Sequence, residues 1–309
     1  MPPGRAHESG DSLYSFVTRD RLSECRLGGV GGRFGGRIGP HSLNSDGDRA
    51  QRAGYRGRMR TIDLNADLGE TVDGVPTADD AALFAVVSSA SVACGGHAGD
   101  AVSMRAAVAA AAAGAVAVGA HPSFADPANF GRVHMSVDPA LLRAQVTAQL
   151  AALAAAGADI RYVKPHGALY HAVSADAGAA RAVAASVADL SSRLGRSVPV
   201  LGLEGEIAAA ATNAGLRFVR EAFLDRGYRA DGTLVARGEH GALLHDAHEV
   251  ADRAVRLAVE GVVVAVGGEL VRSDAASLCV HGDSPGAVAM ARAVRAALEA
   301  EGVAVRAPW

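Results

Sequence analysis

The chain has 309 residues, half of them apolar, and a formal charge of −3 at pH 7. A long uncharged stretch, residues 106–120, is mostly alanine, interrupted by Gly114 and Gly119. This stretch is too short and too weakly apolar to cross a bilayer, so we predict that the protein has no membrane partner.

Residues 1–58 differ in composition from the rest of the chain. They contain twelve glycines, ten arginines and six acidic residues, without a helical or alternating apolar period. Such a segment buries too little apolar surface to offset the entropy lost on ordering, so we predict a disordered, dispensable extension. Met59 opens the sequence MRTIDLN like a natural start, which favours an upstream extension or a misassigned start codon over an arginine-rich nucleic-acid tail.

Residues 59–309 carry 20 basic and 27 acidic side chains, a formal balance of 20 − 27 = −7. An acidic body is a poor match for nucleic acid, which we exclude as a partner. Cys94 and Cys279 lie in apolar runs, which is typical of reduced, buried thiols. We therefore predict a cytoplasmic protein.

Short apolar runs and alanine-rich stretches alternate along residues 59–309. The predicted strands are Thr61–Asn65, Ser88–Cys94, Val116–Ala120, Ile160–Val163, Val198–Leu201, Leu216–Ala222 and Leu278–His281. The predicted helices are Ala101–Ala113, Pro139–Ala156, Ala175–Leu194 and Glu206–Ala214, with Asp100 and Asp138 as cap candidates. This alternation predicts an α/β fold of parallel strands and crossover helices, and the length suits a single closed β/α barrel.

Four of the apolar runs are followed by a histidine flanked by glycine or proline. These residues are His97, His121, His166 and His281. Because the carboxyl ends of barrel strands meet at one rim, where active sites lie, we predict that the four histidines share one polar site. A single histidine of this kind would more often be a structural loop residue.

Carboxylates accompany the histidines. The first strand ends in DLNADLGE, and alternation along it sends Asp63, Asn65 and Asp67 to one face. Further acidic candidates follow this strand or two of the histidines: Glu70, Asp100 and Asp283. Asp100 is equally well explained as a helix cap, whereas Asp67 has no comparable structural role.

Lys164 is the only lysine among 30 basic residues, and it shares the segment YVKPHGALYH with His166 and Tyr170. Arginine serves most surface ion pairs equally well. A lone lysine therefore favours a position that needs a compact ammonium group, although chance is the simpler explanation.

Six segments in order resemble the LamB/YcsF family over Met59–Trp309: IDLNADLGE, SVACGGHAGD, VGAHPSFADPANFGR, YVKPHGALYH, EAFLDRGY and CVHGDSPGAV. The resemblance implies a seven-stranded β/α barrel related to polysaccharide deacetylases. It also implies an ATP-dependent cyclic amide hydrolase that cleaves 5-oxoproline to glutamate as the A subunit of a 5-oxoprolinase, together with subunits B and C. ATP and Mg²⁺ follow from the resemblance alone, because the chain lacks the GxxxxGK[ST] phosphate-binding pattern.

The implied chemistry assigns roles to the motif residues. The expected catalytic residues are Asp67, Lys164, His166, His97 and His121. The expected substrate or phosphate contacts are Asn65, Glu70, Asp100, Arg132, Tyr170, Arg226, His281 and Asp283. An additional divalent metal at His97, His121 and Asp67 is a further hypothesis, since imidazole and carboxylate ligands suit zinc.

Two other functions compete with this one. A metal-dependent carbohydrate N-deacetylase would show an Asp-Asp pair and an HxxxH pair, but the first strand gives Asn65-Ala66-Asp67 and the step from His166 to His171 is five residues. His245 and His248 have a spacing that resembles a zinc pair. They lie near a helix start, where exposed histidines are common, so we interpret them as structural. A non-catalytic subunit that carries a lactam to its partners is the second alternative.

Overall fold

The computed structural model describes residues 60–309, so the predicted disordered extension lies outside the described residues. Seven parallel strands form a closed ring in the order β1, β4, β5, β6, β7, β8, β11, and β11 pairs back onto β1. Their bounds are β1 (Arg60–Leu68), β4 (Ser89–Ala93), β5 (Ala117–His121), β6 (Ile160–Val163), β7 (Val200–Gly202), β8 (Phe218–Phe223) and β11 (Ser277–Val280). The predicted seven-stranded β/α barrel is confirmed.

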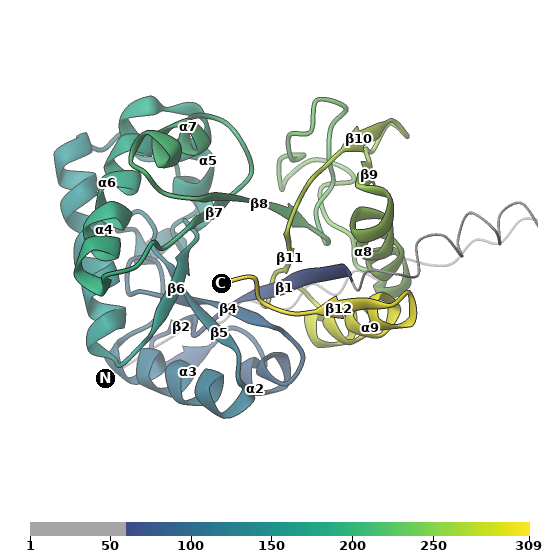
Figure 1. Ribbon diagram of the computed structural model, residues 1–309, viewed down its shortest axis with the longest axis horizontal. Helices are drawn as coiled ribbons and strands as arrows, with labels where there is room; N and C mark the ends of the chain where they lie inside the picture. Colours follow the sequence, from purple (N-terminus) through teal and green to yellow (C-terminus); the bar gives the residue numbers. More distant parts are fainter. Residues whose placement is uncertain (1–59) are drawn as a thin grey trace, which may run out of the picture. The chain divides into compact units, whose positions relative to one another are not determined.

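Helices surround the ring of strands (Figure 1). They are α2 (Asp80–Phe84), α3 (Ala101–Gly114), α4 (Pro139–Ala155), α5 (Gly167–Ala175), α6 (Ala177–Leu194), α7 (Glu206–Asn213), α8 (Ala247–Glu260) and α9 (Ala287–Ala300), with a 3-10 turn η1 (Pro127–Asn129). Asp100 and Asp138 cap α3 and α4 as predicted, because each carboxylate accepts two backbone N–H groups of the first turn.

Several elements were not predicted. They are α2, α5, α8, α9, the hairpins β2 (Thr71–Val72) with β3 (Val75–Pro76) and β9 (Val262–Val264) with β10 (Leu270–Arg272), and β12 (Val303–Val305). The strand β12 pairs with the first residues of β1, whereas β11 pairs with the later ones. One edge of β1 is therefore shared between two strands.

The C-terminal residue Trp309 fills the amino end of the barrel. Its indole Nε1 donates to Ser89 Oγ at 2.9 Å, and its ring lies 4.5 Å from the ring of Tyr162 between centroids. Figure 1 places the C-terminus at the centre of the ring of strands. The amino end is thus filled by an aromatic side chain, which leaves the carboxyl end for a ligand.

The inside of the barrel is polar, whereas the apolar core lies between the strands and the helices. Alternation along β1 sends Leu64 and Leu68 to the core. It sends Asp63 and Asn65 to the interior, where Asp63 accepts hydrogen bonds from Ser88, Ser89 and Ser277. A buried polar interior of this kind is stable only when its groups are paired with one another.

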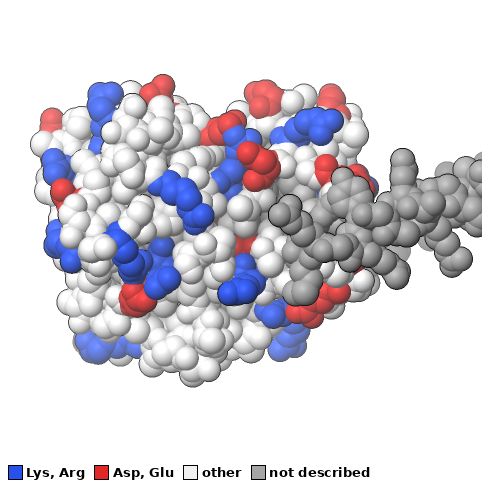
Figure 2. Space-filling view, in the orientation of Figure 1, with Lys and Arg blue, Asp and Glu red and all other residues white. Residues whose placement is uncertain are grey.

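No helix within residues 60–309 is long and apolar enough to cross a membrane. On the face shown in Figure 2, basic and acidic side chains are interspersed among uncharged ones. The two described cysteines, Cys94 and Cys279, are buried free thiols, as predicted.

Candidate active site

A cavity of about 440 Å³ opens at the carboxyl ends of the strands. Eight of the thirteen predicted site residues line it: Asp67, His121, Arg132, Lys164, His166, Tyr170, Arg226 and His281. Its lining carries four cationic side chains (Arg132, Arg226, Arg237 and Lys164), five imidazoles (His121, His134, His166, His171 and His281) and one carboxylate, Asp67. The lining therefore favours an anionic ligand.

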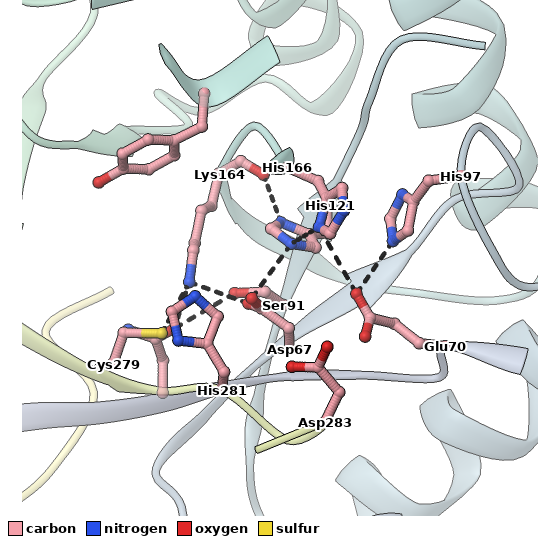
Figure 3. Close-up of polar contacts among 12 residues, drawn as sticks. Asp67, Glu70, Ser91, His97, His121, Lys164, His166, Cys279, His281 and Asp283 are labelled. Carbon is pink, nitrogen blue, oxygen red and sulfur yellow. Dashed lines mark hydrogen bonds and ion pairs between the residues drawn. The ribbon is translucent and has the colours of Figure 1, made fainter. Parts of the chain in front are cut away.

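Lys164 lies at the base of this cavity with only 1 % of its surface exposed. Its Nζ contacts Asp67 Oδ1 at 2.9 Å, Asn65 Oδ1 at 3.0 Å, Glu221 Oε1 at 3.0 Å and Cys279 Sγ at 3.1 Å. Figure 3 shows Lys164 with Asp67 and Cys279. Burial disfavours the charge of Lys164, but the neighbouring acidic groups, Asp67 foremost, outweigh burial and hold its pKa well above the usual value. These four contacts hold the ammonium group of Lys164 in one position.

The carboxylate of Asp67 joins Lys164 to the histidines. Its Oδ2 lies 3.4 Å from His121 Nε2, on the other side of the carboxylate from Lys164. Burial would raise the pKa of Asp67, but His121 and Lys164 outweigh burial and hold it well below its usual range. Asp67 is therefore a carboxylate that stays ionised.

Three histidine rings pack together beside Asp67. The rings of His97 and His166 stack at 3.6 Å between centroids, nearly parallel at 4°, and His121 meets both rings edge-on. Burial, with His97 and His121 nearby, holds the pKa of His166 well below its usual value. His121 and His166 line the cavity, whereas His97 lies outside its lining.

Glu70 and His97 form a buried pair outside this lining. His97 Nε2 lies 3.0 Å from Glu70 Oε1, and His97 Nδ1 has no hydrogen-bond partner. Burial, together with the nearby Asp67 charge, raises the pKa of Glu70 to about 8. Burial lowers the pKa of His97 to about 3.

A glycine allows the loop after β5 to lie over the histidines. Gly131 has a left-handed backbone with φ +62°, and an added Cβ would lie 2.8 Å from His97 Cβ and 3.1 Å from His166 Cδ2. Only glycine combines this conformation with this close approach. The loop therefore excludes solvent from the histidine stack.

Sequence reasoning missed two buried carboxylates that follow the same strand-end logic. Glu221 on β8 pairs with Lys164 and accepts a hydrogen bond from Tyr170 Oη at 3.0 Å. Asp225 lies just beyond β8, and its carboxylate oxygens are 2.8 and 3.0 Å from His281 Nδ1. Both residues belong to the segment EAFLDRGY, where an acid inside or just after an apolar run was the available signal.

The remaining predicted residues lie elsewhere. Asp100 is exposed and its carboxylate caps α3, so its expected substrate contact is wrong. Asn65 lies beneath the cavity, where its amide donates to Glu221, Ser277 and the carbonyl of Leu278. Asp283 forms an ion pair with Arg132 across two loops, outside the cavity lining.

Two further expectations concern Arg226 and the metal ligands. The guanidinium of Arg226 already donates to the carbonyls of Val235 and Ala242, so it braces its own loop as well as lining the cavity. Three described groups of ligand-type side chains lie within 4.8 Å, and none joins His97 with Asp67. The hypothesis of a metal at His97, His121 and Asp67 stays a prediction, and in this structure His97 groups with Glu70 and His166 instead.

The comparisons with known proteins agree on one family. Residues 62–308 match the model of the LamB/YcsF family. The chain is 53 % identical over 252 residues to the A subunit of 5-oxoprolinase from Streptomyces griseus and 49 % identical over 250 residues to that from Corynebacterium jeikeium. These matches cover 80 % and 79 % of this chain and 99 % and 95 % of the relatives.

The fold has a solved counterpart. A crystal structure of a lactam utilization protein from Thermus thermophilus superposes with a TM-score of 0.74 at 42 % identity, covering 80 % of this chain and 99 % of that protein. The family match and the relatives both cover nearly the whole of the described chain. This chain belongs to the LamB/YcsF family.

Proposed function

We propose that this chain is the A subunit of an ATP-dependent 5-oxoprolinase, in which its cavity opens the lactam ring of 5-oxoproline to give glutamate. The names of the relatives support this assignment. The observation that carries it is the cationic cavity at the carboxyl ends of the strands. Such a lining suits 5-oxoproline, which carries a carboxylate, and suits it better still once the lactam is phosphorylated.

The chemistry needs an activated lactam. Amide resonance makes the ring carbonyl a poor electrophile, and phosphorylation of the lactam oxygen by ATP converts it to an imidate-like species. Water adds to the ring carbon, and the carbon–nitrogen bond breaks as the nitrogen takes a proton. A second water then releases phosphate from the resulting acyl phosphate.

The cavity residues fit the parts of this scheme that involve the lactam. Lys164 supplies a fixed ammonium group toward developing negative charge. The first turn of α5, beginning at Gly167, opens on the same cavity, and its partial positive charge supports anion binding. Arg132 and Arg237 line the mouth and are suited to the substrate carboxylate.

The base is best assigned to His281. Asp225 accepts the proton of His281 Nδ1, so the neutral ring presents a bare Nε2, and His281 lines the cavity. This arrangement of carboxylate and imidazole is the one that general-base catalysis uses. Asp67 is a weaker base, because its pKa is held well below the usual range, and we assign it to orienting Lys164 and His121.

ATP and Mg²⁺ are assigned to the complex and not to this chain alone. Within residues 60–309 the glycines that follow the strands are neighbours of histidines in the sequence. The only lysine of these residues, Lys164, forms ion pairs with two carboxylates, Asp67 and Glu221. We therefore propose that subunits B and C supply the nucleotide site and deliver the activated lactam.

The test is an assay of glutamate formation and ADP release from 5-oxoproline and ATP, with this chain alone and with subunits B and C. We expect glutamate only from the complete mixture. Glutamate from subunits B and C without this chain, or no glutamate from the complete mixture, would overturn the assignment. If the chain were only a carrier, substitution of His281 would leave the glutamate rate unchanged while ligand binding persisted.

A further inference from the structure

Two bare nitrogen atoms face each other in the histidine cluster. His121 Nδ1 lies 2.7 Å from the carbonyl oxygen of Lys164, and His166 Nε2 lies 2.9 Å from that of Phe130. A carbonyl oxygen only accepts, so each of these nitrogens carries the ring proton. In neutral rings the other two nitrogens, His121 Nε2 and His166 Nδ1, then have free lone pairs, and they lie 3.0 Å apart.

A carboxylate oxygen lies beside each of these nitrogens. Asp67 Oδ2 lies 3.4 Å from His121 Nε2, and Glu70 Oε1 lies 3.6 Å from His166 Nδ1 (Figure 3). All four side chains are buried. The ionised Asp67 and the two lone pairs repel one another unless a cation or a shared proton lies among them.

The spacing fits a divalent ion. Around a tetrahedral zinc with bonds of about 2.0–2.1 Å, neighbouring ligand atoms lie about 3.3–3.4 Å apart. The two facing nitrogens lie 3.0 Å apart, and Asp67 Oδ2 lies 3.4 Å from His121 Nε2, so both separations are close to this value.

We propose that Asp67, His121 and His166, whose ligand atoms all lie within 4.8 Å of one another, form a binding site for one first-row divalent metal ion, with zinc a good match to two imidazole ligands and one carboxylate. The carbonyls of Lys164 and Phe130 orient the two rings, as second-sphere acceptors do at metal sites. His97 holds Glu70 and stacks on His166 without being a ligand.

The neighbouring group of Asp67, Cys279 and His281 is not a competing site. Lys164 Nζ lies 2.9 Å from Asp67 Oδ1 and 3.1 Å from Cys279 Sγ, so an ammonium group already occupies that position. The metal site is independent of the lactam assignment, since it rests only on side-chain geometry.

The test is a titration of the full chain, stripped with a chelator, with Co²⁺ followed by visible absorption and with Zn²⁺ in competition. We expect one tightly bound equivalent with the absorption bands of a four- or five-coordinate site. His166→Asn should weaken binding at least about 100-fold, because a direct ligand is lost. His121→Asn is a second ligand variant, and circular dichroism checks the folding of both.

His245→Asn with His248→Asn is the matched control, since it removes an exposed histidine pair far from the cluster in sequence. It should leave the tight equivalent unchanged. Absence of saturable binding to the wild-type chain would overturn the proposal and would mean that the two nitrogens share a proton. Loss of binding in the control, with retention in His166→Asn and His121→Asn, would overturn it as well. Neither result bears on glutamate formation, which is assayed separately.

Discussion

Lys164 is the residue whose role changes most between sequence and structure. Its isolation in the sequence favours a functional ammonium group, and the structure surrounds that group with Asp67, Glu221 and Asn65. The same contacts make Lys164 a structural partner, because two buried carboxylates depend on its charge. Its catalytic and structural contributions can be separated only by restoring the charge balance.

Lys164→Met should lower the free energy of unfolding by about 3–5 kcal/mol, since it leaves buried carboxylates without a partner. Adding Glu221→Gln removes one of them and should recover part of that loss. Glutamate formation should remain at least about 100-fold below wild type in the double variant, because the ammonium is still absent. Urea denaturation and the complete assay measure the two effects, and recovery of activity with stability would show that Lys164 is purely structural.

Asp225→Asn tests the orientation of His281. The backbone N–H of His281 and the hydroxyl of Ser284 both donate to Asp225 Oδ2. An asparagine must therefore place its oxygen there and its amide group toward His281 Nδ1, which moves the ring proton to Nε2. We expect the glutamate rate to fall by about 10⁴-fold, as when a catalytic imidazole is held in the wrong tautomer.

Nitrogen-15 NMR of labelled histidine reads the tautomer of His281 directly. A protonated Nε2 in the variant, with unchanged circular dichroism, would establish the positioning role of Asp225. An unchanged tautomer together with a normal glutamate rate would refute it.

At the scale of elements, the apolar runs of the sequence predicted all seven barrel strands, because the face of each strand toward the helices is apolar even where the inner face is polar. Shorter or more charged elements were missed. The strand β12 is three residues long and is fixed by pairing with β1, a contact between distant parts of the chain. The helix α5 begins directly after His166, whose side chain does not cap the first turn. No capping residue therefore marks the start of this helix in the sequence.

The helix α3 provides a test of the reassigned residue Asp100. Its carboxylate accepts from Val102 and Ser103 N–H groups, at the end of the helix and outside the cavity. Asp100→Ala should lower the free energy of unfolding by about 0.5–2 kcal/mol, the usual cost of losing an N-cap. Glutamate formation at 25 °C should not change, and a large fall in rate without unfolding would return Asp100 to the active site.

At the scale of the molecule, the barrel explains why the site could be predicted in outline. Strand ends that are far apart in the sequence meet at one rim, so His121, His166 and His281 could be expected to gather there from their places after apolar runs. Their hydrogen-bond partners could not be expected in the same way. The pairing of His97 with Glu70 and of His281 with Asp225 depends on loop conformations after the strands, which local sequence does not determine.

The central claim is that ring opening takes place in the cavity at the carboxyl ends of the strands. The most direct measurement is the rate of glutamate formation by the complete mixture with Asp67→Asn, which keeps the size of the side chain and removes its charge, beside Asp100→Ala as the matched loss of a carboxylate outside the cavity. We predict a fall of at least about 100-fold for Asp67→Asn, with folding verified by circular dichroism, and a normal rate for Asp100→Ala. Normal rates for both variants would contradict the account and place the chemistry outside this cavity.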